Sequence, residues 1–360
     1  MLQPKSGIVW VFEPAPHALI SALSWKAEES EKLPKRDNRT RVLTRSQRLE
    51  TVRHVVIIGG GISGLASALA LHALGISCSI YEVRGVPSTL GGAVNLTPPP
   101  LRSLDHIGIL KNLQGRGGIT RAIEIFSTLS GNRLGELSFR NVDKIGYHAL
   151  RILRAELQQG MISALEEANI RVEYGKKLVG LRETTESVEA TFEDGSVATG
   201  DILLGCDGIH SIARSKLVDP LRIPVYSGVA AAYGLLSASS ISSPIHFEDC
   251  SVNSSRKGSI LAAFCDPLKQ RLYFAAVMEM KEQAGREGWK VKGGDQDSTR
   301  EEILSRFGDS KMACLREMIE NVEDLFLYPV YTLPPNGKWS SVRVLLLGDA
   351  AHAVRCLYSQ

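Results

Sequence analysis

The stretch Val55-Val56-Ile57-Ile58-Gly59-Gly60-Gly61-Ile62-Ser63-Gly64 decides the fold of this chain. Its first half is a continuous apolar run that ends directly in glycine, which is typical of a parallel strand buried on both faces. Gly59, Gly61 and Gly64 have the spacing that serves a tight turn, close approach of the backbone to a pyrophosphate, and close packing of helix on strand. The helix expected at 62–74 would present free N–H groups and the positive end of its dipole to the phosphates. The stretch therefore predicts a Rossmann-like dinucleotide site in an α/β fold.

A carboxylate follows at the position that such a site requires. The next strand, expected at 76–81, delivers Glu82, which lies 23 residues after Gly59. A carboxylate there can accept both ribose hydroxyls of an adenosine and would repel a phosphate on that ribose. This favours FAD or NAD over NADP at the site. The alternative is a glycine-rich turn of an ordinary α/β protein with a solvated Glu82.

Composition excludes several classes of protein. The 360 residues carry a formal net charge of +3, and the basic residues are dispersed except in the segment 35–41, so no nucleic-acid surface is expected. The six cysteines show no metal-ligand spacing, which predicts a reduced, cytoplasmic protein without a metal site. No run approaches the ~18 apolar residues of a membrane span.

The remaining pattern predicts two interleaved domains. We expect an irregular extension at 1–50, a first part of the FAD-binding domain at 51–222, an inserted antiparallel substrate domain at 223–338, and a return to the first domain at 339–360. Strands near 124–140 are expected to join the substrate domain. Further expected elements are helices at 101–113 and 151–168, a helix that begins with the capping-box spacing at Thr299, a hairpin at 188–198, and buried strands at 202–204 and 342–347.

Two further apolar strands end in an aspartate. Asp207, followed by Gly208, ends one of them, and Asp349, preceded by Gly348, ends the other. Sheets of this class present their ligand crevice at the carboxyl ends of the strands, where a short carboxylate can accept sugar hydroxyls. Arg154, expected on a helix, has the planar donors that match paired phosphate oxygens. The alternatives are helix-capping aspartates and an arginine in a surface ion pair.

Taken together, these motifs resemble those of the class A flavoprotein monooxygenases, the para-hydroxybenzoate and salicylate hydroxylase family, and especially its members that tailor natural products in secondary metabolism. The resemblance covers residues 52–353 and includes Arg154-Ala-Glu-Leu157 and the segment from Val344 to His352. It implies that Arg154 reaches the flavin, that Asp207 and Gly208 serve the FAD pyrophosphate side and a passing nicotinamide cofactor, and that Asp349 binds the ribityl chain.

The resemblance also implies the rest of the site. Gly92 and Ala93, after the second strand, are expected to bind the cofactor, as is Gly348. Tyr233 matches a position at which the family places an arginine or tyrosine facing the substrate, although a tyrosine packed in a core would fit the pattern equally well. Only one dinucleotide fingerprint is present, so NAD(P)H would visit as a co-substrate without a Rossmann domain of its own.

The activity implied is that of an FAD-dependent monooxygenase. Reduced flavin would capture O₂ as a C4a-hydroperoxide and pass one oxygen atom to an aromatic or polyketide-like small molecule, which is thereby hydroxylated or epoxidised. Few catalytic side chains are needed, because the protein orients the substrate and excludes water. No local motif identifies the substrate, the choice of NADH or NADPH, or the oligomeric state.

The sequence departs from the family pattern after His352. The family continues into a proline, a Gly-x-Gly loop and a helix facing the flavin, whereas this chain reads on from Ala353 to Gln360 without them. We therefore expect a chain truncated at its carboxyl end. Two alternatives stay open: a flavin-dependent reductase or halogenase of the same fold, and a truncated dinucleotide-binding module without turnover.

Overall fold

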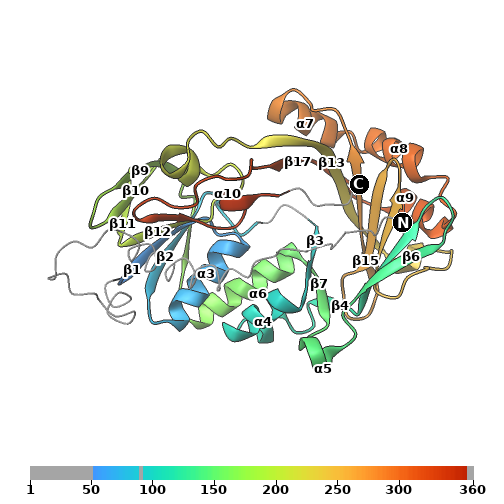
Figure 1. Ribbon diagram of the computed structural model, residues 1–360, viewed down its shortest axis with the longest axis horizontal. Coiled ribbons are helices and arrows are strands. Elements are labelled where there is room, and N and C mark those ends of the chain that lie inside the picture. Colours follow the sequence, from blue (N-terminus) through green and yellow to red (C-terminus); the bar gives the residue numbers. More distant parts are fainter. Residues whose placement is uncertain (1–51, 89–91, 355–360) are drawn as a thin grey trace, which may run out of the picture.

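The computed structural model describes residues 52–88 and 92–354. The extension expected at 1–50 and the segment 355–360, which carries most of the departure from the family pattern, lie outside the described residues. The element labels below are those of Figure 1.

A parallel sheet of five strands forms the centre of one half of the molecule. Its strand order is β18–β12–β1–β2–β8. The apolar run of the glycine stretch is its middle strand, and every residue from Val55 to Ile58 is buried. Helices α3 and α6 pack together on one face of this sheet (Figure 1). The elements are β1 (His54–Ile58), β2 (Ser77–Glu82), β8 (Val172–Tyr174), β12 (Ile202–Gly205), β18 (Val344–Leu346), α3 (Ile62–Ala73) and α6 (Arg154–Glu167).

Two three-stranded sheets flank this centre. The antiparallel sheet β11–β10–β9 shares a hydrophobic core with β1 and β12, in which Phe192 packs near Val56 and Leu203. The sheet β3–β7–β4 lies between the parallel sheet and the other half of the molecule (Figure 1). Their strands are β9 (Leu178–Glu183), β10 (Val188–Phe192), β11 (Val197–Gly200), β3 (Ala93–Leu96), β4 (Gly117–Thr120) and β7 (Ala149–Leu153).

The second half of the molecule is built on a seven-stranded sheet of order β17–β13–β16–β15–β14–β5–β6. Helices α8 and α9 cover its outer face, where Phe307 and Met318 share a core with Phe274 (Figure 1). The elements are β5 (Ala122–Ser127), β6 (Arg133–Ser138), β13 (Val225–Ser237), β14 (Cys250–Ser255), β15 (Gly258–Phe264), β16 (Arg271–Glu279), β17 (Phe326–Thr332), α7 (Gly285–Gly294), α8 (Gln296–Phe307) and α9 (Ala313–Asn321).

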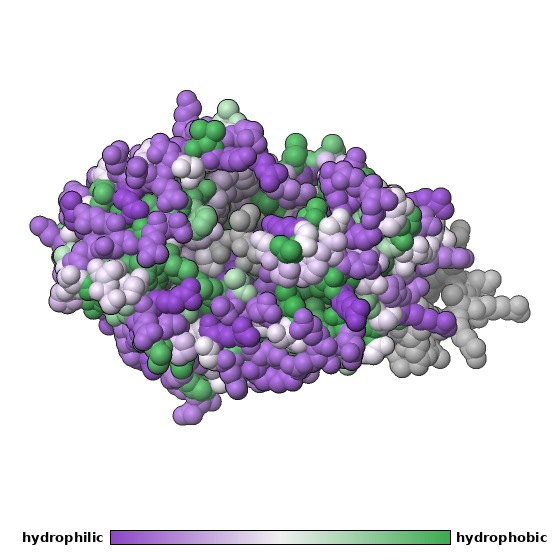
Figure 2. All heavy atoms as spheres, turned by 180° about the vertical axis from the view of Figure 1, so that it is seen from behind, coloured by the Kyte–Doolittle hydropathy of each residue, from purple (hydrophilic) through white to green (hydrophobic). Residues whose placement is uncertain are grey.

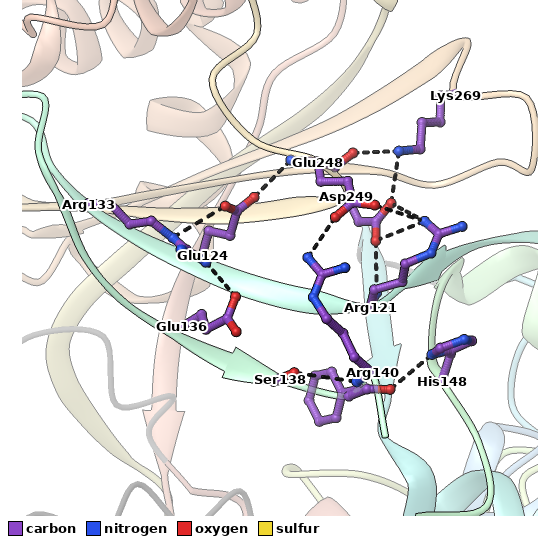
Figure 3. Close-up of polar contacts among 11 residues, drawn as sticks. Arg121, Glu124, Arg133, Glu136, Ser138, Arg140, His148, Glu248, Asp249 and Lys269 are labelled. Atoms are coloured by element: carbon purple, nitrogen blue, oxygen red, sulfur yellow. Dashed lines mark hydrogen bonds and ion pairs between the residues drawn. The ribbon is translucent and has the colours of Figure 1, made fainter. Parts of the chain in front are cut away.

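An ionic network holds the point where the chain crosses between these sheets (Figure 3). Arg121 is the single residue between β4 and β5, and its backbone N–H donates to Asp249 at 2.8 Å. The Asp249 side chain is 1% exposed and also pairs with the Arg121 guanidinium at 3.1 Å and with Lys269 at 2.8 Å. Glu248 accepts from Arg140, beyond the end of β6. The crossover is therefore fixed by charge-assisted hydrogen bonds rather than by apolar packing alone.

Three expected boundaries were wrong. The helix expected at 101–113 is α4 (Pro98–His106), with Pro98 in its first turn, and a separate 3₁₀ turn η1 (Leu110–Leu113), because Gly108 at φ 77° ends α4. The helix expected from 151 begins at Arg154, since 151–153 pair in β7. The helix expected from Thr299 begins at Gln296, where the Asp295 side chain accepts from the Ser298 N–H.

No helix within 52–88 and 92–354 is long and apolar enough to cross a membrane. On the face shown in Figure 2, hydrophilic residues predominate and hydrophobic residues gather in small groups.

Candidate functional site

The three glycine-containing motifs, far apart in the sequence, meet at the carboxyl edge of the parallel sheet. Gly59, at φ 110°, lies so close to the Cys206 carbonyl that an added Cβ would collide with it. Gly348, at φ 59°, lies equally close to the Ser63 side chain. Strands β1, β12 and β18 are parallel neighbours, so their ends form one surface. This edge is where α/β sheets bind ligands.

The glycine loop has one crowded and one open position. A Cβ on Gly64 would collide with the Gly59 carbonyl oxygen, so this glycine allows α3 to pack on the strand. A Cβ on Gly61 would meet no atom within 4 Å, and Gly61 is the N-cap of α3 without a side-chain cap. The open position and the uncapped N–H groups make a cradle of the polarity that a pyrophosphate requires.

Glu82 lies at the end of β2 and is 7% exposed. Its Oε2 accepts the Gly60 N–H at 2.7 Å, and its Oε1 accepts the Arg84 N–H at 3.0 Å. The carboxylate therefore shapes the glycine loop directly. Each of its oxygens keeps a second lone pair for a sugar hydroxyl.

The two carboxylate oxygens of Asp207 differ in their hydrogen bonding. Oδ2 accepts the N–H groups of Ile212 at 2.7 Å and Ala213 at 3.1 Å, which is the capping geometry that the sequence left open. Oδ1 is buried and has no hydrogen-bond partner among the described residues. Burial raises the pKa of Asp207, against hydrogen bonds that lower it. Gly208 follows at φ 77°, where a glycine is required.

Asp349 is exposed at the first position of the short helix α10 (Asp349–His352). The N-cap is Gly348, so Asp349 does not cap the helix, and within the described segments its carboxylate accepts no hydrogen bond. Two arginines hold this helix in place: Arg214 donates to the Ala350 carbonyl at 2.8 Å, and Arg222 donates to the Ala351 carbonyl at 2.7 Å. These positioning roles of Arg214 and Arg222 were not predicted from the sequence.

Arg154 begins α6, and its backbone N–H donates to the Gly92 carbonyl at 3.0 Å. Its guanidinium is half-buried and forms no ion pair or hydrogen bond with any described residue. The alternative of a surface ion pair is thus absent from residues 52–88 and 92–354. Farther along α6, the buried Gln158 donates to the Gly60 carbonyl at 3.0 Å and ties this helix to the glycine loop, a contact with no signal in the sequence.

Tyr233 lies in an aromatic cluster on the seven-stranded sheet. Its ring stacks on Phe326 at 5.4 Å, meets Tyr328 edge-on at 5.5 Å, and lies 6.1 Å from Tyr273. Tyr273 in turn touches Gly92 so closely that a Cβ on that glycine would collide with its ring. Ala93 begins β3 directly after Gly92. The contact therefore joins the aromatic cluster to the expected cofactor segment.

These features fit a bound FAD. The open cradle at Gly61, the buried Glu82 carboxylate and the unpaired Oδ1 of Asp207 are the groups that a pyrophosphate and its sugar hydroxyls would engage. No group of three or more His, Cys, Asp or Glu side chains that could hold a metal ion occurs within the described residues.

Comparison with known proteins agrees with this geometry. Residues 53–357 match the family described as FAD binding domain. The chain is 28% identical to 3-amino-4-hydroxybenzoate 2-monooxygenase PtnB3 of Streptomyces platensis, over 85% of this chain and 75% of the relative. It is 26% identical to the FAD-dependent urate hydroxylase of Klebsiella pneumoniae, over 83% of this chain and 74% of the relative.

The fold is shared with solved structures as well. Klebsiella pneumoniae HpxO, in complex with FAD and uric acid, superimposes with a TM-score of 0.71 at 23% identity, over 84% of this chain and 74% of that one. The family match spans most of the chain, and the named relatives are a monooxygenase and an FAD-dependent hydroxylase. The chain therefore belongs to the FAD binding domain family, as a class A flavoprotein monooxygenase.

Proposed function

We propose that this protein uses NAD(P)H and O₂ to hydroxylate a small aromatic molecule held between the glycine-loop edge and the Tyr233 cluster. The observation that carries the proposal is the contact of Tyr273 with Gly92. This contact places the aromatic cluster directly beside Gly92 and Ala93, the segment expected to bind the cofactor. The substrates named for the relatives, a hydroxybenzoate and urate, are small planar rings of the size that such a cluster would orient.

In this proposal FAD supplies the chemistry, and the residues of the site bind the cofactor and orient the substrate. Bound FAD supplies the redox chemistry and the activation of oxygen. Glu82 would bind the adenosine ribose, and the cradle at Gly61 would bind the pyrophosphate. Arg154 would reach the flavin, and Asp349 would bind the ribityl chain. Asp207 and Gly208 would serve the pyrophosphate side and the passing nicotinamide cofactor. Tyr233 would orient the substrate ring, because its own ring is largely buried and is held in place by three aromatic neighbours, Tyr273, Phe326 and Tyr328.

A substrate screen tests the proposal. FAD-loaded protein is mixed with NADH or NADPH and a panel of phenols, aromatic acids and polyketides, and oxidation of the nicotinamide is followed with analysis of products by mass. We expect one substrate class to accelerate oxidation and to gain one oxygen atom. We expect Tyr233→Phe to keep FAD affinity but to change the KM or the coupling of oxidation to product. Nicotinamide oxidation that no compound accelerates, with an external acceptor reduced instead, would favour a reductase.

A further inference from the structure

One face of the sheet β3–β7–β4 concentrates buried polar groups that have no partner. Asn95 and Arg151 are directly opposed across β3 and β7, so their side chains lie on the same face. Thr120 on β4 opposes Ala149, two residues before Arg151, and lies on that face as well. The Nδ2 and Oδ1 of Asn95, the Nε of Arg151 and the Oγ1 of Thr120 are all buried without a hydrogen bond to any described residue.

Arg151 carries a charge that the described part of the chain does not balance. The residue is 4% exposed, and the one hydrogen bond of its guanidinium to a described residue runs from Nη2 to the Cys250 Sγ at 3.4 Å. Burial raises the pKa of the Cys250 thiol, so this weak acceptor is neutral at neutral pH. The neighbouring Asp249 is already paired with Arg121 and Lys269. A guanidinium does not lose its proton in proteins, and a buried charge requires a counter-ion.

This charge lies beside the aromatic cluster. Ala93 and Leu153 oppose each other across β3 and β7, two residues from Asn95 and Arg151, so they lie on the same face, and they pack against Tyr233 and Tyr273. Tyr273 contacts Gly92 and lies next to Tyr233. A ring seated against Tyr233 and Tyr273 could therefore direct a substituent toward Arg151.

We propose that Arg151 and Asn95 form a specificity-determining subsite for the carboxylate of an aromatic acid. The proposal rests on the proposed function and names the class of its substrate. The planar fork of the guanidinium matches the two oxygens of a carboxylate, and the amide of Asn95 can donate to one of them. Both unsatisfied side chains are then paired by one ligand group.

Matched acids and amides test the charge requirement. Salicylate and salicylamide, benzoate and benzamide, and nicotinate and nicotinamide are titrated into the FAD-loaded protein, and binding is followed by calorimetry and by the flavin absorbance spectrum. We expect at least one acid to bind about tenfold or more tightly than its amide, as for a hydrogen bond to a charged group. Equal binding of acid and amide in every pair, or no binding by any of them, would overturn the proposal.

Variants test whether Arg151 and Asn95 cause the preference for acids over amides. Arg151→Gln should remove the preference by weakening the acid alone, and Arg151→Lys should keep part of it. Arg182→Gln on β9, whose side chain is 74% exposed, is the matched control and should change nothing. Asn95→Asp would supply an internal counter-charge, so it should raise the melting temperature and also abolish the preference, which a merely structural role would not predict.

The outcomes separate this inference from the proposed function. If FAD binds and the acid preference persists in both Arg151→Gln and Asn95→Asp, the subsite lies elsewhere and the inference is wrong. If Arg151→Gln fails to fold, Asn95→Asp and the titrations of the wild-type protein still decide. A protein that takes up no FAD contradicts the proposed function itself, before any acid is added.

Discussion

Replacing Gly61 and Gly64 by alanine, one at a time, separates the cofactor cradle from the packing of the fold. Gly61 has φ −79° and ψ −179°, a conformation open to any residue, and its added Cβ would meet nothing within 4 Å. The methyl group instead occupies the space proposed for the pyrophosphate. Gly64→Ala places its methyl group on the Gly59 carbonyl oxygen, where no space exists.

The expected magnitudes are different for the two variants. Gly61→Ala should change the stability of the FAD-free protein by less than about 1 kcal/mol, because lower entropy of the unfolded chain offsets a poorer N-cap. It should weaken FAD binding by about 1.5–3 kcal/mol, the value of a lost hydrogen bond to a charged group, or roughly 10- to 150-fold in Kd. Gly64→Ala should destabilise the protein by about 3 kcal/mol, because overpacking against backbone relaxes poorly.

Two measurements decide the comparison. Thermal unfolding of the FAD-free variants reports the stability, and quenching of FAD fluorescence on titration reports the affinity. A Gly61→Ala protein that binds FAD as tightly as the wild type would refute the cradle. A Gly64→Ala protein with an unchanged melting temperature would refute the packing argument.

Two other predictions concern carboxylates. Glu82→Gln should weaken FAD binding by about 1–3 kcal/mol, because the buried carboxylate holds the Gly60 N–H and the ribose would lose a charged acceptor; unchanged affinity in the same titration would leave Glu82 a purely structural role. Asp249→Asn should destabilise the protein at neutral pH by about 1–3 kcal/mol. Burial raises the pKa of Asp249, but the bonds and charges of Lys269 and Arg121 bring it below its ordinary value. Its stabilisation is therefore complete above the unfolded pKa of about 3.9 and is lost as the pH falls through the lower folded value, so acid unfolding of the two proteins should converge there.

The central β-α-β unit was predictable because its determinants are local. The apolar run from Val55 to Ile58, the glycine spacing and Glu82 specify strand, turn, helix and strand within 30 residues, and β1, α3 and β2 match them within one residue. The strands at 202–204 and 342–347 were likewise recognisable, because a parallel strand buried on both faces is a plain apolar run.

The missed features depend on contacts distant in the sequence. Residues 151–153 read as the start of a helix, yet they belong to β7, because pairing with β3 and β4 outweighs local propensity. The aromatic cluster joins residues from β13, β16 and β17, and no spacing in the sequence could bring Tyr233, Tyr273 and Phe326 together. The unpaired charge of Arg151 is visible only once its neighbours are placed.

The most direct test of the central claim is the fate of molecular oxygen. FAD-loaded protein, NAD(P)H and the best compound from the screen are incubated under isotopically labelled O₂, and the product is analysed by mass spectrometry. The account predicts one labelled oxygen atom in each product molecule, with the other reduced to water. A product whose new oxygen comes from unlabelled water, or consumption of O₂ with no oxygen in any product, would contradict monooxygenation by this protein.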